Sequence, residues 1–434
     1  MLTSKKIYVF VLNKHGQPLM PCSPEKARTL LKTGKARVVN KNIFTIQLIY
    51  GSSGHKQHVV GGCDTGSKKT AFAVIANESV IYQSEVELRN NIHEKMEQRA
   101  MFRRNRRSRK TRYRKARFNN RGRRDGWLTP TLISKVNSHL REKKFIESVL
   151  PIKLWNVELA EFDIHKIKNP DVSGVAYQEG RQKDFYNIKQ YVLHRDNYQC
   201  QHCTKSKKIK NEKLHVHHIV FKSNGGTDNP DNLITLCKSC HKNLHDGLIK
   251  IKSGNVKQTK HATEISIVKT FIEKSGWIFN KTFGYETKFK REQVLGIPKT
   301  HTNDAVAICC AEGEVVNLSN CVIYKKHVCK GDYQLCKGKR GEIKIPVGKL
   351  FGLKKFDYIS TDKGVGFVKG KRSTGHFAIS DIFGNKISDS VNIKKNCKRL
   401  VARTTTLIEH KLIKNKETKV NFPPTNEFVG SQIK

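Results

Sequence analysis

Acidic side chains are scarce in this chain of 434 residues, in which 37 Asp and Glu stand against 83 Lys and Arg. The resulting formal net charge of +46 is spread along most of the chain, so an ordinary solvated surface does not account for it. A folded protein this basic needs a polyanion as a partner, and the size of the excess indicates nucleic acid.

Other common features are absent as well. The chain shows no signal-peptide pattern, no internal repeat and no apolar run of membrane-spanning length, so we expect no membrane partner and a reducing, cytoplasmic location. Its length allows two to four domains. Twelve cysteines show no paired disulfide framework. The irregular spacing of Cys321, Cys329 and Cys336 favours free thiols over a second metal site.

What the chain does have is a pair of Cys-x-x-Cys motifs, Cys200 to Cys203 and Cys237 to Cys240, around His217-His218 and Asn232. Four cysteines in two pairs can close a tetrahedral zinc site that stabilises a small module with little core. The histidines then remain for a second, catalytic metal. The alternative is a zinc ribbon that only binds nucleic acid, but a ribbon needs neither the adjacent histidines nor the asparagine.

This layout resembles the zinc-stapled HNH, or ββα-metal, nucleases. Phosphodiester cleavage needs an activated water, a metal for the charge on the leaving oxygen and a group that fixes the tautomer of the base. The resemblance implies that His218 is the general base, that His217 and His241 bind the catalytic metal, and that Asn232 holds the catalytic loop and orients His218. His245, one helical turn after His241, is a further candidate ligand.

Two acidic residues upstream lie in apolar segments typical of strands. Residues 58–76 predict a strand that ends at Asp64, a tight turn at Gly66 and a second strand. Residues 154–162 predict another apolar strand, which contains Glu158. Taken singly, each has a structural explanation, because one acid can cap a turn and the other can lie on a half-buried strand.

A third acidic residue lies downstream of the zinc motif. Residues 299–311 predict a helix with His301 and Asp304 on one face, since they are three positions apart. By itself Asp304 can simply cap this helix. Three carboxylates at strand ends and a helix start are nevertheless what two-metal cleavage with Mg²⁺ requires, because they hold the ions beside the attacking and leaving oxygens.

An arginine-rich stretch lies between the first two acidic segments. From Arg99 to Arg124 there are twelve Arg, two Lys and no acid. Such a helix repels itself in water and is expected to be stable against phosphates, which arginine binds in a bidentate manner. The alternative is a disordered basic tail. The position of the stretch between two parts of one fold weakens this alternative. The residues at helical spacing are Arg103, Arg106, Arg107, Lys110, Arg114, Arg117 and Arg121.

Together these motifs resemble the IscB family of transposon-encoded, RNA-guided nucleases over nearly the whole chain. Gln17-Pro-Leu-Met-Pro21 matches the signature of that family's first domain, and a short helix is expected at 24–34. Strand-like runs at 364–370 and 375–380 suit its carboxy-terminal domain. Thr65 is a departure, because the family more often has Pro there; the change affects the rigidity of the turn and not the ligand.

The resemblance implies an α/β multidomain architecture, in which a split RuvC-like RNase H fold carries an inserted, zinc-stapled HNH module. It also implies an arginine-rich bridge helix, a small N-terminal domain and a β-rich C-terminal domain. The expected segments are an N-terminal PLMP domain (1–55), RuvC-like part I (56–93), the bridge helix (94–125), RuvC-like part II (126–170), the HNH domain (171–255), RuvC-like part III (256–314) and a C-terminal domain that contacts target DNA or RNA (315–434).

The function implied is RNA-guided DNA cleavage by a monomer bound to one structured guide RNA and a double-stranded DNA target. The HNH site would cut the guide-paired strand, and Asp64, Glu158, His301 and Asp304 would cut the displaced one. Both sites would use Mg²⁺, while Zn²⁺ would be structural. One alternative is a protein-only HNH nuclease of the homing or restriction type, or a junction resolvase with an added zinc module. Another is a zinc-stabilised RNA-binding protein without catalysis.

Overall fold

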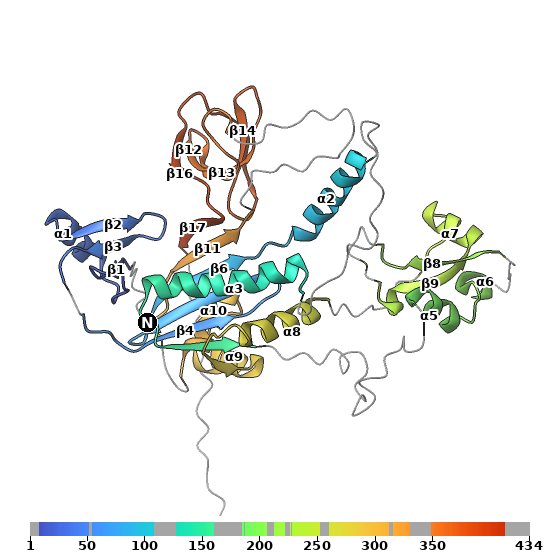
Figure 1. Cartoon of the computed structure of the whole chain (residues 1–434), viewed down its shortest axis with the longest axis horizontal. Coiled ribbons are helices and arrows are strands. Elements are labelled where there is room, and N and C mark those ends of the chain that lie inside the picture. The colour runs from blue at the N-terminus through green and yellow to red at the C-terminus, as the bar shows by residue number, and fades with distance from the viewer. Residues whose placement is uncertain are drawn as a thin grey trace, which may run out of the picture. The chain divides into compact units, whose positions relative to one another are not determined.

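The structure is a computed structural model, and it describes residues 8–51, 54–107, 127–159, 185, 187–205, 212–221, 226, 228–251, 260–311, 316–329 and 349–412. The chain forms two compact units (Figure 1): Met1–Glu161 with Glu264–Lys434, and Phe162–Thr263 between them in sequence. Within the described ranges, no helix is both long enough and apolar enough to cross a membrane.

A seven-stranded sheet in the order β10-β7-β4-β5-β6-β11-β17 organises the first unit. Strands β4, β5 and β6 form an antiparallel meander, β7 lies parallel to β4, and β10 lies parallel to β7. On the other side, β11 is parallel to β6 and antiparallel to β17. The strands are β4 (Val59–Asp64), β5 (Lys69–Ala76), β6 (Ser79–Glu87), β7 (Leu154–Glu158), β10 (Asn280–Thr282), β11 (Cys321–His327) and β17 (Thr406–Leu412).

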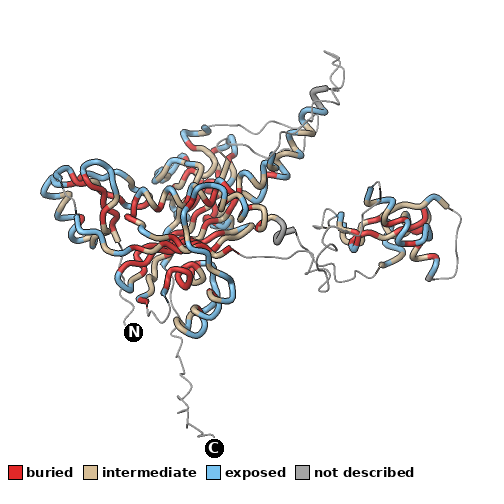
Figure 2. Tube along the Cα trace, turned by 60° about the horizontal axis from the view of Figure 1, so that its bottom comes forward, coloured by how far each residue is buried: buried red, intermediate tan, exposed pale blue. Residues whose placement is uncertain are grey.

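The two faces of this sheet are covered by different helices, because successive side chains of a strand point to opposite faces. Phe72, Val74 and Ala76 of β5 pack in one core with residues of α3 (Pro130–Val149) and α8 (Lys260–Glu273). The alternate residues of β5 pack in a second core with α10 (His301–Cys309). The sheet therefore lies between α3 and α8 on one side and α10 on the other, with the buried residues concentrated there (Figure 2).

Smaller elements flank the sheet. An N-terminal three-stranded sheet packs with one helix, and a five-stranded antiparallel sheet, in the order β15-β14-β13-β12-β16, follows β11. The N-terminal elements are β1 (Phe10–Leu12), α1 (Pro24–Lys32), β2 (Ala36–Asn40) and β3 (Thr45–Leu48). The others are α2 (Ile92–Arg107), α9 (Gly284–Phe289), the π-helical turn η4 (Lys290–Val294), β12 (Tyr358–Thr361), β13 (Gly364–Gly370), β14 (His376–Ser380), β15 (Lys386–Asn392) and β16 (Lys398–Val401).

The second unit is a small module built around one hairpin. The buried cluster at its centre consists of the four cysteines of the two Cys-x-x-Cys motifs and Leu236, with partly buried apolar side chains packed against it, so apolar packing alone offers little stability. Its elements are α5 (Ile188–Arg195), α6 (Gln201–Lys205), β8 (Leu214–His218), the short 3₁₀ turn η3 (Pro230–Asn232), β9 (Leu233–Cys237) and α7 (Lys238–His245).

The expected mixed α/β architecture is confirmed. The strands predicted within 58–76 and 154–162 are β4, β5 and β7, and the helix predicted within 299–311 is α10. The predicted arginine-rich helix is described only as far as Arg107, as the end of α2. Lys110, Arg114, Arg117 and Arg121 lie outside the described residues, as does Cys336.

Candidate functional site

The four cysteines of the second unit converge. Their sulfur atoms all lie within 4.8 Å of one another, and Cys203 Sγ lies 3.7 Å from Cys237 Sγ and 3.5 Å from Cys240 Sγ. Zinc bound tetrahedrally at a Zn–S distance of about 2.3 Å separates its sulfur ligands by roughly 3.8 Å. Burial and the neighbouring thiols of Cys203 and Cys237 raise the pKa of Cys240. This crowded set therefore fits zinc, which stabilises the thiolate form.

Three histidines form a second cluster, because β8 and α7 bring them together. The ring nitrogens of His217, His241 and His245 all lie within 4.8 Å of one another. Burial and the charges of neighbouring histidines lower the pKa of His217 to about 4, so its ring is neutral at physiological pH, as a metal ligand must be. Its Nε2 is buried without a hydrogen-bond partner, which fits a divalent metal at this point.

The next residue, His218, is directed elsewhere. Side chains alternate along β8, so His217 and its neighbour point to opposite sides of the strand. His218 is partly exposed, and its Nε2 lies 2.7 Å from Oδ1 of Asp228. Asp228 was not anticipated from the sequence, since an exposed acid in a polar loop carries no spacing signal. A carboxylate at one ring nitrogen fixes the imidazole orientation and leaves the other nitrogen as a base.

Asn232 holds the loop that follows β8. Its side-chain Oδ1 accepts a hydrogen bond from the Val220 N–H (2.8 Å), and its Nδ2 donates to the Val220 carbonyl oxygen (3.0 Å). The Ile219 N–H donates to the main-chain oxygen of Asn232. A Cβ at Gly226 would lie 1.8 Å from the Val220 oxygen, so this close loop requires glycine. These hydrogen bonds attach Asn232 to Val220, whereas its predicted role in orienting His218 stays a prediction.

In the first unit, sheet register places two predicted acids side by side. Asp64 ends β4, Glu158 ends β7, and the two residues are paired across these parallel strands. Thr65 ties the strand ends together, because its hydroxyl donates to the main-chain oxygen of Glu158 at 2.7 Å. A Cβ at Gly66 would lie 1.8 Å from the Lys69 carbonyl oxygen, so the predicted tight turn requires glycine here.

Helix α10 brings the third acid and the predicted histidine to the same place. It packs directly on β4, since a Cβ at Gly62 would lie 2.4 Å from the Ala305 carbonyl oxygen. His301, the first residue of the helix, places its Nδ1 2.7 Å from Oδ2 of Asp64. Asp304 is one turn further and accepts a hydrogen bond from Arg291 Nη1 at 2.5 Å.

These carboxylates lie in a partly dehydrated environment. Burial raises the pKa of Asp64, although the hydrogen bond from His301 opposes this effect. Burial also raises the pKa of Glu158, and the charges of Asp64 and Asp304 act in the same direction. The hydrogen bond to Asp64 raises the pKa of His301. Buried carboxylates that repel one another are the oxygen ligands that divalent cations such as Mg²⁺ relieve.

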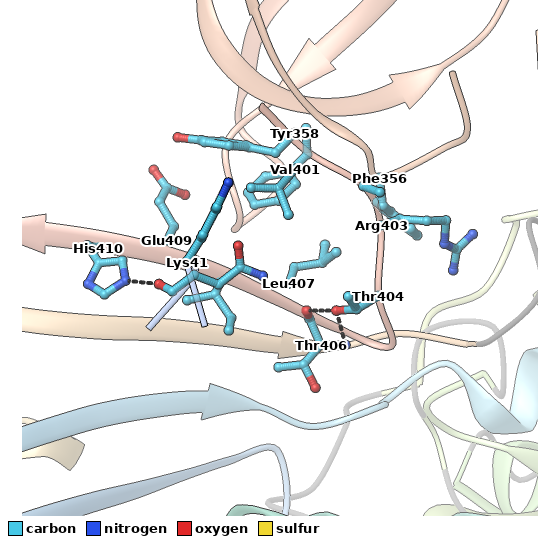
Figure 3. Close-up of a pocket in the computed structure, with 14 residues that line it drawn as sticks. Lys41, Phe356, Tyr358, Val401, Arg403, Thr404, Thr406, Leu407, Glu409 and His410 are labelled. Atoms are coloured by element: carbon cyan, nitrogen blue, oxygen red, sulfur yellow. Dashed lines mark hydrogen bonds between the residues drawn. The ribbon is translucent and has the colours of Figure 1, made fainter. Parts of the chain in front are cut away.

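A cavity of about 260 Å³ lies elsewhere in the first unit, among strands β12, β13 and β17 and the loop after β2 (Figure 3). His410 Nε2 donates to the Asn42 carbonyl oxygen at its edge. Phe356 and Tyr358 form aromatic walls, and Lys41 and Arg403 add positive charge. None of the predicted catalytic residues lines this cavity.

Among the described residues, the structure therefore assembles the predicted site residues at two places. The histidine and cysteine clusters contain every metal ligand predicted for the zinc module, and His245 joins them. Neither cluster includes Cys321 or Cys329. Sequence reasoning missed Asp228, which has no spacing signal. It also missed Thr287 and Arg291, which donate hydrogen bonds to Glu158 and Asp304 and meet these acids only through the tertiary fold.

Comparison with known proteins supports the zinc module as a nuclease. Residues 9–180 match a family model described as RRXRR protein, and residues 200–247 match the HNH endonuclease model. The chain is 36% identical over 100 residues to the type IV methyl-directed restriction enzyme EcoKMcrA of Escherichia coli (strain K12), covering 21% of this chain and 36% of that enzyme. It is 38% identical over 60 residues to Anaredoxin of Nostoc sp. (strain PCC 7120), covering 14% of this chain and 74% of that protein.

The chain thus spans about a third of the length of the restriction enzyme it matches. The HNH match covers both Cys-x-x-Cys motifs, the histidine pair, Asn232 and the histidines of α7. The expectation of a metal-dependent DNA nuclease is confirmed for this module. Residues 200–247 therefore match an HNH endonuclease domain, which supports a metal-dependent nuclease module in this part of the chain.

Proposed function

We propose that the chain is an RNA-guided DNA endonuclease of the IscB type, with one nuclease site for each strand of the target. The observation that carries this proposal is that one strongly basic chain holds two separate groups of potential metal ligands, the histidines of the HNH domain and the carboxylates Asp64, Glu158 and Asp304. A single-site nuclease needs only one of them. The HNH domain cuts the guide-paired strand, and the carboxylate site of the first unit cuts the displaced strand.

At the HNH site, His218 is the general base. Its Nε2–H is donated to Asp228, so the neutral ring presents Nδ1 to accept a proton from the attacking water. His217 and His241, with His245, would hold a divalent metal ion, which would supply positive charge beside the leaving oxygen. Asn232 keeps the loop in place through Val220. The four cysteines would hold structural Zn²⁺.

Strand order supports a RuvC-like, RNase H-type site in the first unit. That fold has a three-stranded antiparallel meander followed by parallel strands beside its first strand, which is the arrangement of β6-β5-β4-β7-β10. Asp64 and Glu158 end neighbouring strands, and Asp304 lies on a helix packed against them. These three residues would hold Mg²⁺, and His301 is placed to exchange a proton at the Asp64 carboxylate.

Charge supports an RNA partner. The net charge of +46 is large for 434 residues, and a structured guide RNA together with a DNA duplex would neutralise it. The match to the RRXRR family model includes Arg103 to Arg107, which reads Arg-Arg-Asn-Arg-Arg. Base pairing would then supply sequence specificity, while the protein contacts the backbone of the duplexes. A monomer with one RNA is the form we propose.

A protein-only DNA nuclease is the second candidate. The similarity to a restriction enzyme favours it, although that similarity covers 21% of this chain. The protein-only hypothesis gives no role to the carboxylate site of the first unit or to the arginine-rich stretch.

The deciding experiment is to express the chain with its flanking non-coding DNA, purify it in high salt and sequence the RNA that co-purifies. We expect one abundant structured RNA that maps beside the gene and supports cleavage of both strands of a matching target. Heterogeneous RNA combined with guide-independent cutting would overturn RNA guidance and favour the protein-only nuclease.

A further inference from the structure

Each carboxylate of the site in the first unit is held through one oxygen by a different neighbour. His301 Nδ1 lies 2.7 Å from Oδ2 of Asp64. The Thr287 hydroxyl donates to Oε2 of Glu158 at 2.5 Å. Arg291 Nη1 donates to Oδ1 of Asp304 at 2.5 Å. A carboxylate fixed in this way keeps its second oxygen for another ligand.

Two of the three neighbours come from one short helical segment, α9 and η4. Thr287 and Arg291 are four residues apart, so they lie on the same face, one turn above the other. The segment widens to a π-helical turn directly after α9, where the Leu295 N–H bonds to the Lys290 oxygen. Such turns are frequent at functional sites. At the start of α9, a Cβ on Gly284 would lie 3.3 Å from Glu158 Oε1, so the segment closely approaches the acid.

Burial makes the orientation of Arg291 informative. Its side chain is 6% exposed, whereas Glu292, its other carboxylate partner, is 42% exposed. A guanidinium is costly to bury unless it is paired and hydrogen-bonded. If Arg291 were paired only with the exposed Glu292, its guanidinium could remain in solvent. Its inward position is therefore explained by the contact with Asp304.

The carboxylates also need such support. Asp64 and Glu158 are paired across neighbouring strands, and like charges held this close in a partly buried site repel one another. Without fixed partners, side chains that repel one another would turn apart. Neighbours that orient metal ligands commonly contribute 10- to 100-fold to metal affinity or activity.

We propose that Thr287 and Arg291 are positioning residues, which hold Glu158 and Asp304 through one oxygen each so that the other oxygens face a divalent cation. This inference rests on the proposed RuvC-like function of the site. The alternative is that both contacts only stabilise the fold. The two explanations differ in the metal affinity of the folded protein.

The test is Mn²⁺ binding to the full chain, freed of RNA and followed by electron paramagnetic resonance. A His217→Ala, His241→Ala background removes the histidine cluster of the second unit, so that the carboxylate site dominates. Thr287→Val and Arg291→Gln are the test variants, and Arg291→Lys is the conservative one. Lys288→Gln is the matched control, because it lies in the same helix with a side chain that is 68% exposed. Tryptophan fluorescence of Trp155 and Trp277, which lie in the core, confirms folding.

We expect both test variants to weaken Mn²⁺ binding about tenfold, with partial rescue in Arg291→Lys and no change in Lys288→Gln. Unchanged or tighter binding in folded Thr287→Val and Arg291→Gln would overturn the inference. Thr287→Val is nearly isosteric, so it keeps the test valid even if Arg291→Gln does not fold. Asp64→Ala distinguishes failure of this inference from failure of the proposed function. If Asp64→Ala does not change Mn²⁺ binding in the background protein, the proposed RuvC-like function fails.

Discussion

At the scale of single residues, adjacent histidines acquire different chemistry from the alternation of a strand. His217 is buried against two other histidines, whereas His218 is partly exposed beside Asp228. Burial keeps the first ring neutral and ready to bind a metal, while the carboxylate orients the second ring. One residue of sequence therefore separates the proposed metal ligand from the proposed base.

Replacing the base of one site should leave the other site intact. His218→Ala is expected to slow cutting of the guide-paired strand by about 10²- to 10⁴-fold, the usual contribution of a general base. Asp64→Ala should instead abolish cutting of the displaced strand, because it removes a carboxylate ligand. Strand-specific end labels on the target measure both effects. Cutting of both strands at the unmodified rate by either variant would contradict the assignment.

Asp228 offers a finer test of the same site. Asp228→Asn keeps the shape of the side chain but weakens its hold on His218 Nε2, so we expect cutting of the guide-paired strand to slow about tenfold, a typical effect for a residue that orients a catalytic group. Asp231→Asn is the matched control, an exposed acid in the same loop. Equal rates in the two variants would assign Asp228 no role in orienting the base.

At the scale of secondary-structure elements, α3 and β11 are joined by buried charges. Glu142 on α3 accepts hydrogen bonds from Lys325 Nζ at 2.6 Å and from His327 Nε2 at 2.8 Å, both on β11. Burial alone would raise the pKa of Glu142, but these two neighbours outweigh it and lower that pKa to about 2. The contact connects the first part of the sheet unit with a strand that follows α10.

This buried acid predicts a pH-dependent stability. Because its pKa falls from 4.5 to about 2 on folding, Glu142 stabilises the fold above about pH 4.5, and the contribution, about 3 kcal/mol, is lost as the pH falls towards 2. Glu142→Gln should therefore lower the urea midpoint strongly at pH 6 and less at pH 3.5. All three tryptophans belong to the first unit, so their fluorescence reports on it.

The exposed Glu97→Gln is the control for this measurement, since its side chain is 67% exposed on α2. It should leave the midpoint nearly unchanged at both pH values. An effect of Glu142→Gln that does not depend on pH would show that packing, and not charge, is what the substitution disturbs.

We expect the β8–β9 hairpin and α7 to depend on bound metal for their stability, unlike the larger sheet. Cys237→Ser removes one of four ligands from a core that is mostly cysteine, so we expect loss of bound zinc and of HNH cleavage. Tryptophan fluorescence should not change, because the tryptophans lie in the other unit. Elemental analysis checks the zinc. Cys22→Ser, which lies outside the module, is the control and should retain the bound zinc. An unchanged zinc content in Cys237→Ser would refute the four-cysteine site.

At the scale of the whole molecule, positive charge dominates. We expect guide RNA to bind with an affinity that falls steeply with salt, because each phosphate contact releases counterions. Arg103→Ala and Arg104→Ala, both exposed on α2, should each reduce the slope of log affinity against log salt by roughly 0.7. Filter binding over a range of salt concentrations measures this slope. Lys386→Ala is the control, because it removes a lysine that is already paired with Asp389. If the arginine variants show the same slope as the unmodified protein, α2 does not contact the RNA.

By itself the sequence determined the features that are local. Cys-x-x-Cys spacing, the histidine pair and the apolar runs that end at Asp64 and Glu158 were all readable, because metal-ligand spacing and strand alternation act over a few residues. Only the tertiary structure decided which distant groups meet. His301 reaches Asp64 across 237 positions, and Thr287 reaches Glu158 across 129. Such contacts follow from sheet register and from how closely α10 packs at Gly62, which no local pattern encodes.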